Sequence, residues 1–331
     1  MPFVLLALLG IFLKRRGMIG ETFVTQGNKV IFYFAIPTTI FNHIHRADLS
    51  AVFDLRFLVF NSLWLVVFFL AIWILAAKFM RDKNSVSSFV NSAYRSSLSV
   101  VAPPLLWLMF YVGNNPGIDE NILPKGILAV SVLLIISYAT AATLFAVHDS
   151  KKGGVFGIFV AIAKNPVVIG VVIGLVFNML GWTLTSDVLY PTYYEGYAVY
   201  KIISTATFAS NTVTALAALV MPLAMICVGG NLAFRGFDSK FKYAVISTVI
   251  KLFVMPIAAV IVAYLFGFRD SDLTIIMILN ALPMAVGAYV MQAELGGDSY
   301  IGASVLMLTM TLSAFTLTLF IFLFRVFGWL V

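Results

Sequence analysis

A cluster of polar side chains lies in the stretch RSSLSVVAPPLLW, which starts at Arg95 inside an otherwise apolar segment. Four residues have the spacing i, i+3, i+4 and i+7, which predicts one face of a helix: Ser92, Arg95, Ser96 and Ser99. An arginine at mid-membrane costs about 2.5–3.5 kcal/mol on insertion scales, so this face should turn toward the protein interior or water. The alternative is that Arg95 lies near the membrane surface and extends its side chain into the interface. The first arrangement favours binding of an anion.

Prolines interrupt two of the apolar segments. Pro104 follows the polar stretch, and Pro283 lies in NALPMAVG, three residues after Asn280. A proline inside a helix removes a donor and frees a carbonyl of the preceding turn, and within lipid such groups need partners. If the two broken segments cross at these prolines, each can satisfy the other. The N-termini of the half-helices would then point into the crossing with partial positive charge, which again favours an anion.

These features predict a substrate site at the crossing, built from Arg95, Ser97, Ser99, Pro104, Asn280 and Pro283. Asn280 has two roles open to it, because it could contact the ligand or cap the end of the broken helix. Lys251, in VISTVIKLFVMP, raises the same choice as Arg95, and for Lys251 we favour a side chain that extends into the interface. His43 and His45 are expected at the outer interface.

The sequence offers little for catalysis or for binding a metal. No Asp or Glu lies in the middle of an apolar segment, which argues against a buried proton relay or a charged sodium site. HExxH, P-loop and Ser-His-Asp patterns are also absent. We therefore expect no enzyme, no catalytic residues, no cofactor and no resident metal. Sodium or proton coupling stays open, because serine and amide oxygens, for example those of Ser99, Asn280 and Gln292, can hold sodium at broken helices.

Composition places the chain in a lipid bilayer. The 331 residues are 62% hydrophobic and 11% charged, whereas soluble domains are about half apolar and about a quarter charged. The net charge of +7 is spread over short loops and does not point to nucleic acid. Spanning helices need about 20 apolar residues, and ten segments are predicted: 2–13, 27–44, 54–78, 86–112, 123–147, 155–181, 203–234, 241–267, 272–293 and 299–327.

The loops between these segments predict the orientation. Thirteen basic residues fall on one side and five on the other, and the side with the excess should be cytoplasmic. Ten spans then leave both termini outside, in a plasma membrane or, in a bacterium, the inner membrane. The first segment, about 12 residues long, would cover roughly 18 Å of a core roughly 30 Å thick. Either the true start lies upstream or this segment reaches only part of the way.

The two halves of the chain resemble each other. Pro37 in segment 2 corresponds to Pro222 in segment 7, and Pro104 in segment 4 to Pro283 in segment 9. Five spans per half make the second half run upside down relative to the first. We therefore predict an all-α polytopic membrane protein of two inverted five-helix repeats, 1–147 and 155–331, with broken, crossing helices 4 and 9. Inverted repeats with matching helix breaks are typical of transporters.

Four stretches carry a family resemblance over nearly the whole chain: YFAIPTTIFNHI, KNPVVIGVVIGLVFNMLG, MPLAMICVGGNLAF and NALPMAVGAYVMQAELGGDSYIGAS. They resemble the auxin efflux carrier family of bacterial and plant transporters, within the bile acid–sodium symporter superfamily. The chain departs from the family pattern at Ser97, where an Asn is expected, and at Ala102, where a Gly is expected. In the plant carriers that Asn helps to hold the substrate carboxylate, so the departure puts auxin itself in doubt. The short HDSKKGG connection between the halves matches a prokaryotic member.

The resemblance implies a scaffold of spans 1, 2, 6 and 7, a mobile core of spans 3–5 and 8–10, a homodimer formed through the scaffold, and an elevator-like motion. Together with the residues above, it predicts a secondary transporter for a small organic anion such as a carboxylate. The alternative from another class is a membrane receptor or sensor that binds its ligand without net transport. An ion channel is a third, weaker interpretation.

Overall fold

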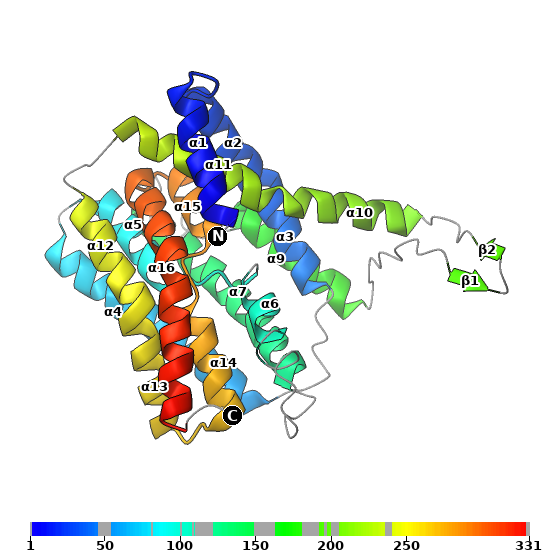
Figure 1. The fold of residues 1–331 in the computed structure, drawn as a ribbon, viewed down its shortest axis with the longest axis vertical. Helices are drawn as coiled ribbons and strands as arrows, with labels where there is room; N and C mark the ends of the chain where they lie inside the picture. Colours follow the sequence, from blue (N-terminus) through cyan, green and yellow to red (C-terminus); the bar gives the residue numbers. More distant parts are fainter. Residues whose placement is uncertain are drawn as a thin grey trace.

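The computed structural model describes residues 2–45, 54–80, 82–99, 101–107, 109, 122–148, 163–180, 192–194, 197–199, 205–235 and 240–328. Helices dominate this part of the chain (Figure 1). The first half contains α1 (Pro2–Arg15), α2 (Glu21–Val30), the π-helical η1 (Ile31–Ala35), α3 (Ile36–Ile44), α4 (Leu55–Phe79), α5 (Lys83–Tyr94), α6 (Ala102–Trp107) and α7 (Ile122–His148).

The second half begins with α9 (Pro166–Met179) and a two-stranded antiparallel hairpin, β1 (Thr192–Tyr194) and β2 (Tyr197–Val199), in which Tyr193 pairs with Ala198. It continues with α10 (Thr205–Ala218), α11 (Val220–Arg235), α12 (Phe241–Val249), the π-helical η3 (Ile250–Val254), α13 (Met255–Leu265), α14 (Asp270–Ala281), α15 (Val286–Glu294) and α16 (Ser299–Val326). Each of the ten predicted apolar segments contains helix in its described part, and segments 86–112 and 272–293 are interrupted by non-helical residues.

Five described helices are long and apolar enough to cross a membrane: Leu55–Phe79, Lys125–Val147, Phe208–Leu232, Phe241–Leu265 and Ser299–Val326. Side chains with hydrogen-bonding oxygens fix where several helices begin. The carboxylate of Asp54 accepts from the N–H of Phe57 at the start of α4, and that of Asp298 accepts from the N–H of Tyr300 at the start of α16. Such caps satisfy backbone donors that have no partner within the helix.

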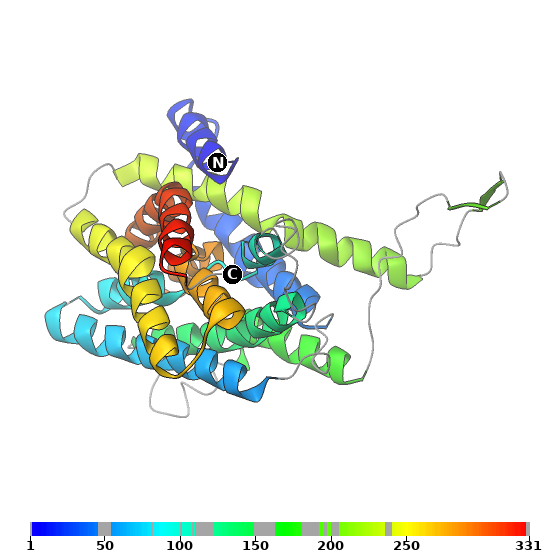
Figure 2. The same cartoon turned by 60° about the horizontal axis from the view of Figure 1, so that its bottom comes forward.

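The short first helix packs along α11. α1 lies against α11 so closely that a β-carbon at Gly229 would overlap the carbonyl oxygen of Ala7, and one at Gly10 would overlap that of Ile226. Small residues allow this approach of two backbones, which is common between helices in membranes. Figure 2 shows α1 at the edge of the bundle, so its outer face, including Leu5 and Phe12, is exposed.

The two halves of the interrupted ninth segment, α14 and α15, form the centre of the molecule. Every residue from 273 to 281 and from 286 to 292 is buried. α14 packs against α13, α7 and α16, and α15 packs against α5, α11 and α16 (Figures 1 and 2). A helix that is buried all round can hold polar groups away from lipid, so this centre is where the candidate site is built.

Candidate functional site

The two interrupted segments cross as antiparallel extended strands. α5 ends at Tyr94 and α14 ends at Ala281, and Ser96 then pairs with Met284. The N–H of Ser97 donates to the carbonyl of Pro283 at 2.9 Å, and the N–H of Ala285 donates to the carbonyl of Arg95 at 3.2 Å. The two segments therefore cross and each satisfies backbone groups of the other, but the first segment crosses at residues 95–97 and not at Pro104 as predicted.

The first break lies earlier than the sequence suggested. The chain leaves the helix at Arg95, whereas Pro104 is the third residue of α6. A proline in the first helical turn removes an N–H that would have no intrahelical partner, so Pro104 helps to start α6 and does not interrupt a helix. The side chain of Pro104 lies outside the described part of the chain. Pro283, by contrast, is buried within the extended connection itself.

A cavity of about 160 Å³ lies beside the crossing. Arg95, Ser97 and Ser99 line one wall, and the start of α15, Ala285 to Gly287, lines another; α3, α7, α10 and α11 supply the rest. Cavities of about 150 Å³ hold a benzene-sized molecule, so this one suits a small organic ligand. No side chain caps α15 at Ala285, which leaves the positive end of this helix at the cavity.

The guanidinium of Arg95 is buried in this wall and has no ionic partner among the described residues. The side chain is 1% exposed, so it does not extend into an interface, and that alternative is wrong. Its guanidinium carbon lies 4.1 Å from the centre of the Tyr138 ring, and Nη1 donates to the sulfur of Met291 at 3.0 Å. Nε has no hydrogen-bond partner among the residues that the structure describes. An anion in the cavity would supply what this buried cation lacks.

Lys251 is a second buried cation at the same crossing. It belongs to η3 and is 0% exposed, so the expectation that it extends into the interface is wrong. Its ammonium donates to the hydroxyl of Ser96 at 2.7 Å, to the carbonyl of Asn280 at 2.9 Å and to the sulfur of Met255 at 3.3 Å. Its place near the middle of a 25-residue apolar span could have indicated burial from the sequence.

The shared helical face proposed for the polar stretch is not present, because α5 ends at Tyr94. The hydroxyl of Ser92 accepts from the side-chain amide of Gln292 at 2.8 Å, away from the cavity wall. Ser96 borders the cavity, but its hydroxyl is engaged by Lys251. Ser99 lies beyond the extended segment and lines the cavity.

Asn280 lies behind the crossing and does not line the main cavity. Its amide donates to the carbonyl of Ile276 at 2.8 Å, and its side-chain oxygen accepts from the indole N–H of Trp64 at 2.9 Å. It borders instead a separate void of about 10 Å³ that also touches Asn61 and Ser96. This side chain is thus tied to the last turns of α14 and to α4.

Sequence reasoning missed the residues that face the crossing from other helices. Tyr138 of α7, Thr39 of α3 and Met221 of α11 all line the cavity. No motif marks them, since each is a common residue of an apolar helix. Of the two histidines expected at the interface, the imidazole of His45 is buried, where it stacks on Phe41 and its Nδ1 lies 2.7 Å from the carbonyl of Phe41; the side chain of His43 lies outside the described residues.

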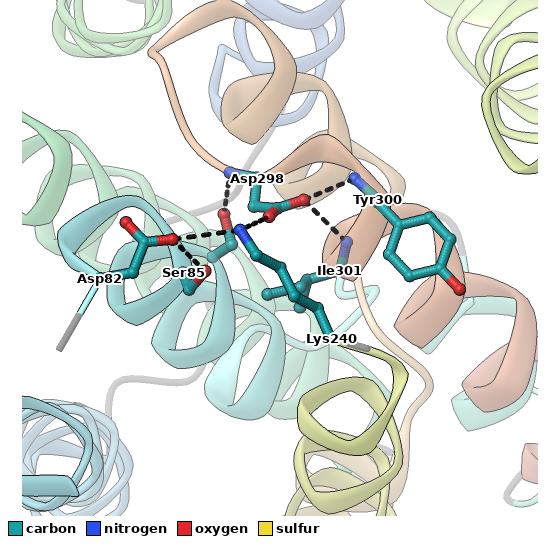
Figure 3. A network of polar contacts seen from close by, with 7 residues as sticks. Asp82, Ser85, Lys240, Asp298, Tyr300 and Ile301 are labelled. Carbon is teal, nitrogen blue, oxygen red and sulfur yellow. Dashed lines mark hydrogen bonds and ion pairs between the residues drawn. The ribbon is translucent and has the colours of Figure 1, made fainter. Parts of the chain in front are cut away.

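A cluster of charges at one end of the bundle, here called the Lys240 cluster, ties three helix starts together (Figure 3). The ammonium of Lys240, before α12, lies 2.7 Å from the carboxylate of Asp298 and 3.1 Å from that of Asp82, before α5. The hydrogen bond to Asp298 is the largest influence on the pKa of Lys240 and raises it. Because the carboxylate of Asp298 also caps α16, the cluster joins α5, α12 and α16.

A second cluster, here called the Lys125 cluster, lies at the opposite end of the helix bundle and also contains one lysine and two aspartates. The ammonium of Lys125, in α7, lies 2.6 Å from the carboxylate of Asp272 in the first turn of α14 and 2.7 Å from that of Asp54, the cap of α4. The continuous helix from α12 to α13 separates the two clusters. Its 25 residues correspond to about 37 Å at 1.5 Å per residue.

Several known proteins resemble this chain in sequence. The family model described as "Membrane transport protein" matches residues 156–321. The chain is 21% identical over 300 residues to the uncharacterized transporter YfdV of Escherichia coli K12, covering 89% of this chain and 86% of YfdV. It is 24% identical over 324 residues to an uncharacterized transporter of Methanothermobacter thermautotrophicus, covering 96% and 94% of the two chains. The chain therefore belongs to the membrane transport protein family, that of the auxin efflux carriers, and is a membrane transporter.

Proposed function

We propose that the protein is a secondary transporter that carries a small organic anion, such as a mono- or dicarboxylate, in the cavity at the crossing. The observation that carries this proposal is Arg95, a buried cation with an unpartnered N–H and no ionic partner among the described residues. A carboxylate would bind it through charge-assisted hydrogen bonds. The hydroxyls of Ser97 and Ser99 and the start of α15 would add donors on the same side.

The two charge clusters support the proposed inverted repeat of 1–147 and 155–331. In such a repeat α4 corresponds to the α12–α13 segment, α7 to α16, and α5 to α14. The Lys125 cluster joins the starts of α4, α7 and α14, and the Lys240 cluster joins the starts of α12, α16 and α5. When each helix is replaced by its counterpart in the other half, the helix starts of one cluster become those of the other. Each cluster has one lysine and two aspartates, although the lysine is on α7 in one and before α12 in the other, and these two helices are not counterparts.

The position of the cavity supports alternating access by an elevator-like motion. One wall belongs to the proposed core, through the two breaks and α7, and the other to the proposed scaffold, through α3, α10 and α11. Movement of the core along the scaffold would carry the cavity from one side of the membrane to the other. The exposed apolar face of α1 is compatible with a homodimer formed through the scaffold.

The basic residues favour a topology with both termini outside and the loop around residue 150 in the cytoplasm, in the plasma membrane or the inner membrane of a bacterium. The Lys240 cluster would then lie at the cytoplasmic end of the core. An uncoupled carrier in such a membrane would act as an exporter, because an inside-negative potential favours exit of a monovalent anion by about 2.3 kcal/mol per 100 mV.

The test is a thermal-shift screen of mono- and dicarboxylates on the purified protein, followed by flux of the stabilising compound in sealed proteoliposomes. Ligand that binds the folded state raises its melting temperature. Saturable accumulation that follows an imposed potential supports the transporter. Saturable binding without accumulation would instead establish a receptor or sensor, and flux that does not saturate would indicate a channel. Arg95→Met is the control that should remove both the shift and the flux.

A further inference from the structure

The surroundings of the Lys251 ammonium resemble a coordination sphere. Three acceptors face it, namely the hydroxyl of Ser96, the main-chain carbonyl of Asn280 and the sulfur of Met255. An ammonium has three N–H donors and no acceptor, so this set matches its donors in number. No carboxylate among the described residues lies within 4 Å of it. The positive charge is thus held by neutral ligands inside the protein.

The two oxygen acceptors come from the segments that form the crossing, and the sulfur comes from Met255 at the start of α13. Asn280 lies in the last turn of α14, where carbonyls have no partner within the helix and carry the negative end of its dipole. Ser96 is the residue that pairs with Met284 across the crossing. Carbonyls and hydroxyls at broken helices are the ligands with which transporters hold a coupling cation. Here a side chain of the protein occupies such a set of ligands.

We propose, building on the transport function proposed above, that Lys251 is a positioning residue that supplies a covalently attached cation to the crossing in place of a bound metal ion. Its ammonium donates hydrogen bonds to Ser96, in the first break, and to the carbonyl of Asn280, at the end of α14 just before the second break. The neighbours of Ser96 in the chain, Arg95 and Ser97, line the cavity. An attached cation is never released on either side of the membrane, so no gradient of a cation at this position drives the anion.

The π-helical turn at η3 agrees with this role. Residues 250–254 depart from the α-helix in the middle of the span that also contains α12 and α13. Single π-turns inside α-helices are frequent at functional sites. This π-turn contains Lys251, whose side chain reaches the crossing. Pro256 is the second residue of α13, which begins after the π-turn.

The experiment compares the full-length wild type with Lys251→Ala and Lys251→Met by thermal unfolding in detergent. Sodium chloride or methylammonium chloride replaces choline chloride at constant ionic strength. The wild type should melt at the same temperature in all three salts. Lys251→Ala should melt lower in choline and regain much of the loss, saturably, in sodium or methylammonium. Lys251→Met, which fills the same space without a charge, should not respond to either cation.

Two results would overturn the proposal. One is a saturable stabilisation of the wild type by sodium, which would mean that a sodium site exists beside Lys251; this measurement stands even if the alanine variant does not fold. The other is a folded Lys251→Ala protein that responds to the cations no more than Lys251→Met. Neither readout uses the anion. Failure here is therefore distinguishable from failure of anion transport, which is measured through Arg95→Met and carboxylate flux.

Discussion

Arg95 and Lys251 are two buried cations at one crossing, and their surroundings differ in kind. The ammonium of Lys251 meets two oxygen acceptors and a sulfur, whereas the guanidinium of Arg95 meets one sulfur and the face of a ring and leaves Nε without a partner. A buried charge without partners is costly. Protein groups therefore satisfy the cation on one side of the crossing, whereas the cation on the other side keeps an unused N–H for the anion that we propose.

The backbone explains how neighbouring residues serve the two sides. Residues in an extended segment alternate between two faces. Residues 95–99 all border the cavity, but the hydroxyl of Ser96 is turned to the Lys251 ammonium, whereas neither Arg95 nor Ser97 contacts Lys251 among the described hydrogen bonds. A continuous helix would have placed Arg95 and Ser96 near each other on one face, so the break itself separates the group that we propose binds the anion from the group that contacts Lys251.

The largest effect is expected from Arg95→Met. Charge-assisted hydrogen bonds contribute about 1.5–3 kcal/mol each. Loss of two such bonds to a carboxylate should therefore raise its Kd by roughly a hundredfold or more. The protein should still fold, because an apolar side chain replaces a buried charge that has no ionic partner in the described part of the chain. Arg95→Lys, which keeps the charge, should recover part of the affinity. An unchanged carboxylate thermal shift in Arg95→Met would remove Arg95 from the site.

Ser97→Ala should weaken the carboxylate with little change in stability. The variant loses a hydroxyl at the cavity wall, and one hydrogen bond to a charged group corresponds to about 1.5–3 kcal/mol, or roughly 10- to 150-fold in Kd. The backbone bond from Ser97 to Pro283 is kept. Titration of the ligand against both proteins measures the change. Equal affinities would show that this hydroxyl does not reach the ligand.

Ser96→Ala is the matched variant for the other side and should have the opposite phenotype. The variant removes one of the three acceptors of the buried Lys251 ammonium. The unsatisfied N–H should lower the free energy of unfolding by about 1–3 kcal/mol. Anion affinity of the folded protein should stay near the wild-type value. If instead affinity falls as in Ser97→Ala and stability does not, the two sides of the crossing are not distinct.

Tyr138→Leu tests what holds the guanidinium in place. A cation over an aromatic face contributes about 0.5–2 kcal/mol, and the Tyr138 ring lies 4.1 Å from Arg95. Removal of the ring should weaken the carboxylate by a factor of about 2–30 because Arg95 loses its support. Tyr138→Phe keeps the ring and is the control that should remain close to wild type. Equal losses in both variants would point to the hydroxyl.

Much of this architecture could be predicted from the sequence, because apolar length and prolines act locally. The apolar runs predicted the helices, and the prolines of segments 4 and 9 predicted that both are interrupted. The break at Arg95 could not be placed, since proline at 104 permits either a kink or a helix start. Lys251 and Tyr138 depend on which helices pack at the crossing, and no local pattern shows that.

The smallest effect on ligand binding is expected from Asn280→Ala, although sequence reasoning placed this residue in the site. Its side chain bonds Trp64 and the carbonyl of Ile276, and Lys251 uses only its main-chain carbonyl, which alanine retains. The free energy of unfolding should fall by about 1–3 kcal/mol, since two buried hydrogen bonds are lost. Kd for the carboxylate should change by less than about twofold, because a change below roughly 0.4 kcal/mol is expected where no contact is lost. A loss as large as that of Ser97→Ala, in a variant that still folds, would mean that the ligand passes behind the crossing and that Asn280 contacts it during transport.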